Sequence, residues 1–414
     1  MNYPNIKLGD IFKIQSGGTP SRKNSRFYEN GTIPWVKTGN LKVKYINEVD
    51  EYITLTALDQ SSAKLFPPKT VLVAMYGATI GACAISNIEC ATNQACAAFL
   101  PNSDVNEEYL YYCLSNLKPY FIQQAVGGAQ PNISLNFLNN IFIPLPPLPE
   151  QQRIAAVLSA ADALCQKRRD TLVWLEQLVQ STFYEMFGDP LENPKGWPVV
   201  QVSDFVANFE SGKSITASNL QEETDYKVLK ISAVTGNSFN LSETKPLPQD
   251  YIPPQHHLVQ QGDLLFSRAN TSELVGATAY VFETEPNIAL PDKIWRFKWK
   301  EPKIVSPLYC WILFSNPFIQ NQIANNASGS SGSMKNISQA KMMQMQVICP
   351  PLELQNRFET ALLEIYARQK AYQQSLQNLE SLFDSLMYHA FQGHLVFSDE
   401  GIENLMAQMQ AEAA

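Results

Sequence analysis

The fold is decided by the stretch Pro146-Pro147-Leu148-Pro149-Glu150-Gln151-Gln152-Arg153-Ile154 and by the periodic segment that it introduces. From position 154 to position 186, apolar-leaning residues recur at alternating steps of four and three, the heptad pattern of a helix that pairs with another helix. The signature returns 204 residues later as Pro350-Pro351-Leu352 with Gln355 and Arg357, and a second heptad series runs from 358 to 390 in the same register. The sequence therefore predicts two long helices that pair antiparallel, each about 38 residues and roughly 57 Å in length.

The predicted helices have clear boundaries. Prolines precede both starts, and Gly188 and Gly393 follow both ends, where a glycine cap is expected. Polar Arg168 and Gln369 interrupt the apolar series near the middle, a device that can fix register at some cost in stability. The residues expected to form the pairing seam are Ile154, Leu158, Leu172, Leu175 and Val179 in the first helix, and Phe358, Leu362, Leu376, Leu379 and Phe383 in the second.

An internal repeat extends over the whole chain at a period near 200 residues. Ser16-Gly17 corresponds to Ser211-Gly212, Leu65–Val73 corresponds to Leu258–Phe266, and Asn132-Ile133-Ser134 corresponds to Asn336-Ile337-Ser338. Short apolar runs separated by Gly and Pro predict strands in each copy. The expected fold class is α+β, with two mixed, strand-rich domains in an internal repeat, separated by two long antiparallel coiled-coil helices. The expected segments are 1–149, 150–187 (helix), 188–198 (linker), 199–352, 353–392 (helix) and 393–414 (tail).

The net charge of −8 is unevenly distributed. Residues 1–149 carry 11 basic and 10 acidic groups, and residues 195–352 carry 13 of each. Residues 150–194 carry 4 and 7, and residues 353–414 carry 3 and 9. The acidic excess therefore lies on the helices, the linker and the tail, so the strand-rich domains remain able to contact a polyanion.

The sequence carries no convincing catalytic or metal-binding pattern. No apolar run approaches the roughly 20 residues of a membrane-spanning helix, and Met1-Asn2-Tyr3-Pro4 does not resemble a signal peptide, so we expect a soluble, cytoplasmic protein. The 7 cysteines form no C-x-x-C pair, which favours reduced core thiols and no metal site. Gly212-Lys213-Ser214 resembles the end of a phosphate-binding loop, but Ala207 occupies the position of the required upstream glycine.

Basic and aromatic residues alternate within 22–44, a composition typical of a nucleic-acid patch or of a solvated face. Glycine-containing loops near 127–131 and 328–333 lie at equivalent places in the two copies. The candidate DNA-binding residues of the first domain are Thr19, Ser21, Arg22, Lys23, Trp35, Lys37, Asn40, Lys42, Lys44 and Gln130. Those of the second domain are Lys213, Ser214, Thr216, Lys230, Arg268, Asn270, Ser331 and Lys335.

A set of short motifs runs through the chain: Leu8-Gly9-Asp10, Ser16-Gly17-Gly18-Thr19-Pro20, Ile33-Pro34-Trp35 with Gly39-Asn40, Gly77-Ala78-Thr79-Ile80-Gly81, the run from Ile143 to Ile154, and Phe187-Gly188-Asp189-Pro190. With these motifs the chain resembles the DNA-specificity subunit of a Type I restriction-modification enzyme over essentially its full length. The second copy departs from this pattern, because Ser214-Ile215 replaces Thr19-Pro20 and a longer stretch from Asn270 to Gly276 replaces the Gly-Ala-Thr-Ile-Gly turn.

The resemblance implies a non-catalytic subunit with two target recognition domains. Each domain would read one half of a split site in double-stranded DNA. The helices would set the spacing and dock two methyltransferase subunits, and a nuclease-translocase subunit would join through the assembled complex. No cofactor is expected in this chain; S-adenosylmethionine, ATP and Mg²⁺ would belong to the partners.

Two other classes of function remain open on the sequence alone. A stand-alone methyltransferase or nuclease would need nucleotide or metal motifs that the sequence lacks. A coiled-coil scaffold without sequence-specific DNA binding would explain the helices but not the repeated basic, aromatic loops.

Overall fold

The computed structural model describes residues 3–128, 130–214, 225–329 and 334–392. The described residues form two compact units, one within Met1–Thr171 and Tyr372–Ala414 and the other within Leu172–Ala371. We call these the first unit and the second unit. Within the described ranges, none of the helices combines the length and the apolar character that a membrane span requires. The predicted tail 393–414 lies outside the described residues.

The first unit is built on a five-stranded sheet in the order β2-β10-β7-β8-β4. Its strands are β2 (Ile14–Ser16), β4 (Tyr45–Ile46), β7 (Thr70–Ala74), β8 (Cys83–Ser86) and β10 (Cys96–Phe99). A second sheet has the order β5-β3-β9-β6, from β3 (Ile33–Val36), β5 (Tyr52–Ile53), β6 (Leu65–Phe66) and β9 (Cys90–Thr92). A further antiparallel pair joins β1 (Asn5–Lys7) to β11 (Phe142–Pro144).

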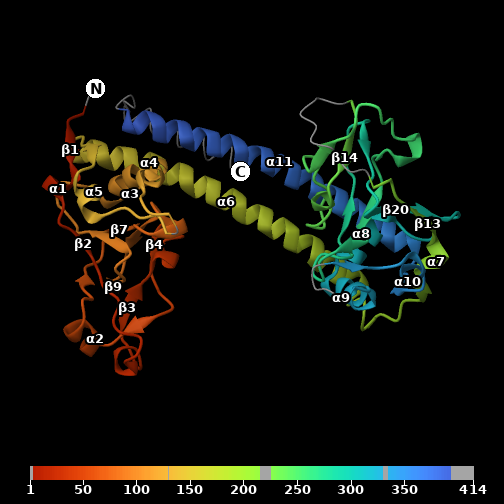
Figure 1. The fold of residues 1–414 in the computed structure, drawn as a ribbon, viewed down its shortest axis with the longest axis horizontal. Helices are drawn as coiled ribbons and strands as arrows, with labels where there is room; N and C mark the ends of the chain where they lie inside the picture. Colours follow the sequence, from red (N-terminus) through yellow and green to blue (C-terminus); the bar gives the residue numbers. More distant parts are fainter. Residues whose placement is uncertain (1–2, 129, 215–224, 330–333, 393–414) are drawn as a thin grey trace. The chain divides into compact units, whose positions relative to one another are not determined.

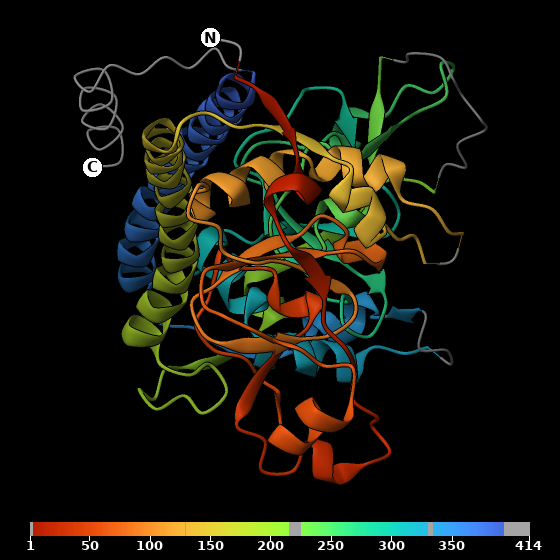
Figure 2. The same ribbon diagram turned by 90° about the vertical axis from the view of Figure 1, so that its left-hand side faces the viewer.

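Helices cover one face of the large sheet in the first unit (Figures 1 and 2). They are α1 (Leu8–Ile11), α3 (Glu107–Asn116), α4 (Lys118–Gln124) and α5 (Leu135–Asn139), whereas α2 (Leu55–Gln60) lies with the smaller sheet. Strand β7 alternates between two cores: Val71 and Val73 face the helices, while Leu72 and Ala74 face a smaller apolar cluster. The complete burial of β7 on both faces explains why its residues from Val71 to Ala74 are all apolar.

The second unit repeats this architecture with fewer strands in each sheet. Its main sheet has the order β13-β20-β16-β18, formed by β13 (Val206–Glu210), β16 (Leu264–Ser267), β18 (Thr278–Tyr280) and β20 (Ile294–Trp299). Its smaller sheet, β15-β14-β19, joins β14 (Lys227–Leu229), β15 (Thr244–Pro246) and β19 (Ile288–Ala289), and β12 (Val199–Gln201) pairs with β22 (Gln346–Ile348). The helices are α7 (Val202–Phe205), α8 (Pro307–Ser315), α9 (Pro317–Asn326) and α10 (Gln339–Met343). The predicted duplication and α+β fold class are confirmed.

Two long helices, α6 (Leu148–Phe187) and α11 (Leu352–Phe391), pair antiparallel within each unit. In the first unit, Ile154 and Leu158 of α6 share a core with Leu379 and Leu386 of α11. In the second unit, the opposite ends meet, because Val179 and Phe183 of α6 share a core with Phe358 of α11. Among the other predicted seam members, Leu362 is also buried in the core of the second unit. Three are partly buried against these cores, namely Leu175, Leu376 and Phe383, and Leu172 is half-buried.

The polar seam residue Arg168 is 7% exposed and lies with its guanidinium 4.2 Å from the ring centroid of Tyr372. A cation over an aromatic face is stabilised by the ring quadrupole, and the long aliphatic stem packs as an apolar group. This contact lets the heptad series continue through a charged position.

A buried glutamine fixes the start of each long helix. The Gln151 side chain donates to the carbonyl oxygens of Pro146 (2.9 Å) and Asp104 (3.0 Å), and its Oε1 accepts from the backbone N–H of Asn106 (2.9 Å). Both amide donors and the amide oxygen are therefore satisfied in a side chain that is 1% exposed. Since Asn106 caps the N-terminus of α3, the glutamine ties the long helix to the sheet-covering helix.

Gln355 makes the same three contacts in the second unit. It donates to the carbonyl oxygens of Pro350 (2.7 Å) and Ile304 (3.2 Å) and accepts from the backbone N–H of Ser306 (2.8 Å), the N-cap of α8. Its side chain is 0% exposed. The repeated Pro-Pro-Leu signature with its glutamine is thus explained as an attachment between helix and domain, which we call the glutamine lock.

Candidate nucleic-acid interface

The repeated Ser-Gly dipeptide marks a point where two backbone segments nearly touch. A Cβ atom on Gly17 would lie 2.0 Å from the carbonyl oxygen of Thr92, and one on Gly212 would lie 1.6 Å from that of Leu290. Any side chain at these positions would collide with the neighbouring backbone, so only glycine fits. In both units the chain then enters the loop that contains predicted DNA-binding residues.

The two most separated repeat motifs of the second unit meet in one cleft of about 570 Å³. Ser211 contributes from the end of β13, and Asn336, Ile337 and Ser338 contribute from the repeated Asn-Ile-Ser. Arg268 also lines this cleft, directly after β16. Strand β17 (Ala269–Asn270) pairs antiparallel with β21 (Lys335–Asn336), which places the predicted residues Arg268, Asn270 and Lys335 together.

The first unit has the corresponding arrangement around Gln130. The backbone N–H of Gly77 donates to the carbonyl oxygen of Pro131 (2.9 Å), and that of Ile133 donates to Met75 (3.0 Å). Gln130 is exposed, and its Nε2 atom lies near Gly77, 3.9 Å from where a Cβ atom would be. The glycine-containing loop and the turn after β7 therefore lie beside each other at one end of the sheet.

The basic stretch of the first unit is largely exposed but partly neutralised. Thr19, Ser21, Arg22, Lys23 and Lys42 are exposed. Arg22 and Lys37 both form ion pairs with the carboxylate of Glu51, at 2.5 Å for Arg22, and these contacts lower the pKa of Glu51. The guanidinium of Arg22 also lies over the ring of Tyr28, 4.4 Å from its centroid.

Two predicted DNA-binding residues occupy positions that do not fit that role. Trp35 is 2% exposed, sits in an apolar cluster and donates its indole N–H to the carbonyl oxygen of Gly18 at 3.2 Å, so it is a core residue. Lys44 points to the helices: its ammonium group contacts Ser159 (2.6 Å), Tyr112 (3.0 Å) and Glu108 (3.3 Å). The regular alternation of basic and aromatic residues could not distinguish these inward positions from the exposed ones.

The remaining predicted residues have mixed surroundings. Lys213 and Ser214 are exposed, whereas Lys230 pairs with Glu243 at 3.6 Å and Lys335 donates to the carbonyl oxygen of Ala324 at 3.4 Å. The side chain of Asn40 accepts from the backbone N–H of Lys37 (2.9 Å), which makes it a turn-forming residue. Thr216 and Ser331 lie outside the described residues.

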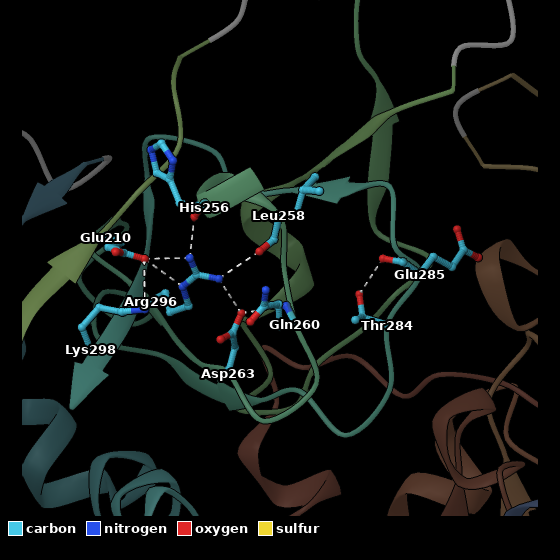
Figure 3. Close-up of polar contacts among 9 residues, drawn as sticks. All are labelled: Glu210, His256, Leu258, Gln260, Asp263, Thr284, Glu285, Arg296 and Lys298. Carbon is cyan, nitrogen blue, oxygen red and sulfur yellow. Dashed lines mark hydrogen bonds and ion pairs between the residues drawn. The ribbon is translucent and has the colours of Figure 1, made fainter. Parts of the chain in front are cut away.

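An ion-pair cluster surrounds Arg296 in the second unit (Figure 3). Arg296 is 4% exposed and donates to the carboxylates of Glu210 (2.7 Å) and Asp263 (3.0 Å), as well as to the carbonyl oxygens of His256 and Leu258. Burial opposes ionisation of Glu210, but its contacts with Arg296 and Lys298 bring the pKa of this carboxyl below its ordinary value. Glu210 is the last residue of β13 and directly precedes Ser211, which lines the cleft.

Several residues of this region carry no specific signal in the sequence. Glu51 neutralises the basic stretch from a position outside 22–44, and Gln94 accepts a hydrogen bond from the Thr19 hydroxyl across 75 positions of sequence. Trp295 forms the floor beneath Arg268, with 5.9 Å between the guanidinium and the ring centroid. The fold brings these partners together from distant parts of the sequence, and no pattern in the sequence links them.

The described residues contain no group of three or more His, Cys, Asp or Glu side chains placed to hold a metal ion. The carboxylates that do cluster, Glu210 and Asp263, already accept hydrogen bonds from Arg296. The exposed cations and polar side chains at the strand ends are instead of the kind that contacts a polyanion.

Comparisons with known proteins point to one family. The family model for the Type I restriction modification DNA specificity domain matches residues 2–172 and 194–380. The chain is 24% identical over 426 residues to the Type I restriction enzyme MjaIX specificity subunit of Methanocaldococcus jannaschii, covering 96% of this chain and 94% of that protein.

Two solved structures have a similar fold. The Type I restriction-modification system S subunit from M. genitalium has a TM-score of 0.58 at 14% identity, covering 96% of this chain and 97% of that one. A chain from a study of complex assembly and conformational transition of the type I R-M system has a TM-score of 0.57 at 17% identity, covering 95% and 98%.

Proposed function

The chain belongs to the family of Type I restriction-modification DNA specificity subunits, and on that premise we propose that each of its two units reads one half of a bipartite, asymmetric DNA site. Members of this family are non-catalytic DNA-recognition subunits of the complex, and so is this chain. A scaffold without sequence-specific DNA binding is not favoured.

The observation that carries the proposal is the repetition of one architecture with unequal loops. The strand order β2-β10-β7-β8 of the first unit is equivalent to β13-β20-β16-β18 of the second. Both units also have the close backbone contact at the Ser-Gly dipeptide and the Asn-Ile-Ser segment. They differ at the strand ends, where Arg268 of one unit corresponds to Met75 of the other. Shared scaffolds with different loops are suited to two half-sites of different sequence, because phosphate contacts position a protein and base contacts specify the site.

We further propose that α6 and α11 set the distance between the half-sites and dock two methyltransferase subunits, with a nuclease-translocase subunit joining through the complex. The continuous 40-residue helices and the glutamine locks at their starts support a rigid spacer. S-adenosylmethionine, ATP and Mg²⁺ would be bound by the partners.

The test is to co-express the chain with its methyltransferase partner in a host that lacks other systems and to sequence the methylated genome. A split motif with two defined halves is expected, and the purified chain alone should neither methylate nor cleave DNA. Turnover by the chain alone, or an unsplit motif, would refute the proposal.

The spacer proposal has its own test. One heptad inserted after Thr171 and one after Ala371 keeps the seams facing each other and lengthens the pair by about 10 Å, or roughly 3 base pairs. We expect unchanged half-sites with a longer unread gap. A single insertion is the matched control, and it should disrupt the pairing. An active double variant with the original gap would show that the helices do not set the spacing.

A further inference from the structure

Arg268 is held rigidly on the floor of the cleft in the second unit. Its backbone N–H donates to the carbonyl oxygen of Lys293 (3.1 Å), and its own carbonyl oxygen accepts from Ile337 (3.0 Å). The guanidinium lies over Trp295, donates from Nε to the carbonyl oxygen of Asp292 (2.8 Å), and donates from Nη1 to Oδ1 of Asn336 (3.1 Å). Such preorganisation reduces the conformational entropy that binding a ligand would cost.

The hydrogen bonds of this guanidinium leave one edge available. Arginine has five N–H donors, and two of them are used by the contacts to Asp292 and Asn336. The carboxylate of Asp292 forms an ion pair with Arg268, with 3.9 Å between Oδ2 and Nη2, but this distance is too long for a hydrogen bond. In the part of the chain that the structure describes, donors on both Nη1 and Nη2 therefore remain for a ligand. A pair of parallel N–H donors matches the O6 and N7 acceptors of guanine in the major groove.

The two units carry different residues at the position of Arg268, although the backbone hydrogen bonds around that position are the same. In each unit, the isoleucine of Asn-Ile-Ser donates its backbone N–H to the equivalent residue just beyond the central strand, which is Met75 in the first and Arg268 in the second. Met75 is buried at 3% exposure, whereas the Arg268 side chain is 26% exposed. Strand register also aligns Ala97 with Trp295, so the first unit lacks the aromatic floor.

Residues that the two units share are expected to contact the phosphates, which both half-sites also share. Residues that differ between the units are expected to contact the bases. Resting on the proposed function, we propose that Arg268 is a specificity-determining residue that reads a guanine in the half-site of the second unit through its Nη1 and Nη2 donors. The neighbouring hydroxyls of Ser211 and Ser338 would contact the backbone of the same site.

The experiment compares genome methylation by complexes that contain the wild-type chain, Arg268→Met, Arg268→Lys or the control Lys303→Met. Methionine is the residue that the first unit carries at this position, and lysine keeps the charge without the planar pair of donors. Lys303→Met removes an exposed charge of the same unit outside the cleft. Binding of the complexes to the cognate duplex and to each single-base variant is measured at fixed salt.

For Arg268→Met and Arg268→Lys, we expect one G·C pair in one half-site to lose its discrimination by roughly 10- to 100-fold, with the other half-site unchanged. Lys303→Met should keep the wild-type motif. Equal weakening on all sequences would identify Arg268 as a phosphate contact and overturn the proposal, as would full specificity in Arg268→Lys.

Two further outcomes separate this proposal from the function on which it rests. A wild-type motif in which one half-site contains no G·C pair, with both Arg268 variants unchanged, overturns the assignment of Arg268 and leaves the function intact. No sequence-specific methylation by the wild-type complex overturns both. If Arg268→Met fails to assemble, the Arg268→Lys result decides.

Discussion

At the centre of its sheet, the first unit carries Ala98 where the second carries Arg296. Ala98 pairs in register with Gln15 and Leu72, and Arg296 pairs with the corresponding Glu210 and Leu265. Ala98 packs in an apolar cluster, whereas around Arg296 two carboxylates and two carbonyl oxygens converge. The same strand order therefore tolerates either an apolar or an ionic centre.

The contacts between each unit and the long helices also differ in part. In the first unit, Lys44, Glu108 and Ser159 form a hydrogen-bonded group, which we call the polar junction, beside ring contacts such as Tyr109 with Phe391. In the second unit, the rings of Phe282 and Tyr366 stack with 3.6 Å between centroids, which we call the aromatic junction, beside an ion pair between Lys370 and Glu283. The glutamine lock is common to both junctions, and so is a ring contact between a tyrosine and a long helix, Tyr109 with Phe391 in the first unit and Tyr309 with Phe187 in the second.

The largest effect is expected at the ionic centre. Arg296→Met leaves Asp263 without its cation and leaves Glu210 with Lys298 alone, at 3.7 Å, and breaking one partner of a buried ion pair typically costs about 3–5 kcal/mol. The free energy of unfolding, measured by denaturant titration, should fall by that order. Combining Arg296→Met with Glu210→Gln and Asp263→Asn should recover much of the loss, since the first unit manages without these charges. A triple variant as unstable as the single one would contradict this explanation.

The glutamine lock should matter equally on both sides. Gln151→Leu and Gln355→Leu each leave one backbone N–H and two carbonyl oxygens without their partner, at a cost of about 2–3 kcal/mol. Thermal unfolding of the two variants should show similar losses. The exposed neighbour Gln152 is a suitable control, because Gln152→Leu should change stability little. Strongly unequal losses would show that the repeated motif serves different purposes in the two units.

The aromatic junction is expected to contribute less. Phe282→Ala removes ring contacts with Tyr366, Tyr280 and Trp311, but Phe282 is only half-buried, so we expect a loss of about 1–2 kcal/mol in the free energy of unfolding. Phe282→Tyr should retain most of it. A loss in Phe282→Ala as large as that of the lock variants would make the stack an attachment in its own right.

The polar junction should give the first unit an acid-dependent stability. Burial opposes ionisation of Glu108, but donors from Ser159, Tyr45 and Lys44 outweigh it and lower the pKa of this carboxyl. A carboxyl with a lowered folded-state pKa stabilises the fold above its unfolded pKa, and this contribution is lost as the pH falls through the folded value. Stability should therefore decline below about pH 4.5, and Glu108→Gln should weaken this dependence. An unchanged pH profile in Glu108→Gln would exclude Glu108 as its source.

The smallest expected effect is a difference between Lys23 and its neighbour Arg22 in the salt dependence of DNA binding. Lys23 is exposed, whereas Arg22 already pairs with Glu51. If both contact phosphate, Lys23→Ala should reduce the slope of log binding constant against log salt by about 0.9, and Arg22→Ala by less, because DNA would have to displace Glu51. Binding of the assembled complex to cognate duplex over a salt series measures both slopes. Equal slopes for wild type and Lys23→Ala would identify this stretch as a solvated face.

The sequence predicted the elements that depend on periodicity and repetition. Heptad spacing identified α6 and α11, which begin at Leu148 and Leu352, close to the expected 150 and 353. The direction of individual side chains could not be predicted from the sequence. Trp35 and Lys44 belong to the same basic and aromatic stretch as Lys23, but packing turns both of them toward the interior. The Arg296 cluster was missed for the same reason: its partners lie 86 and 33 positions away and meet only through strand pairing.

The glutamine locks hold their domains entirely through main-chain atoms: two carbonyl oxygens and one N–H in each case. Hydrogen bonds of this kind do not depend on the side chains of the segment that the glutamine contacts. The lock itself therefore tolerates changes of side chain in that segment as long as the backbone path is kept. Contacts such as Lys44 with Ser159 and Phe282 with Tyr366 are different, because a change in the domain would there require a matching change in the helix. Divergence of the reading loops far from these side-chain contacts leaves both kinds of attachment in place.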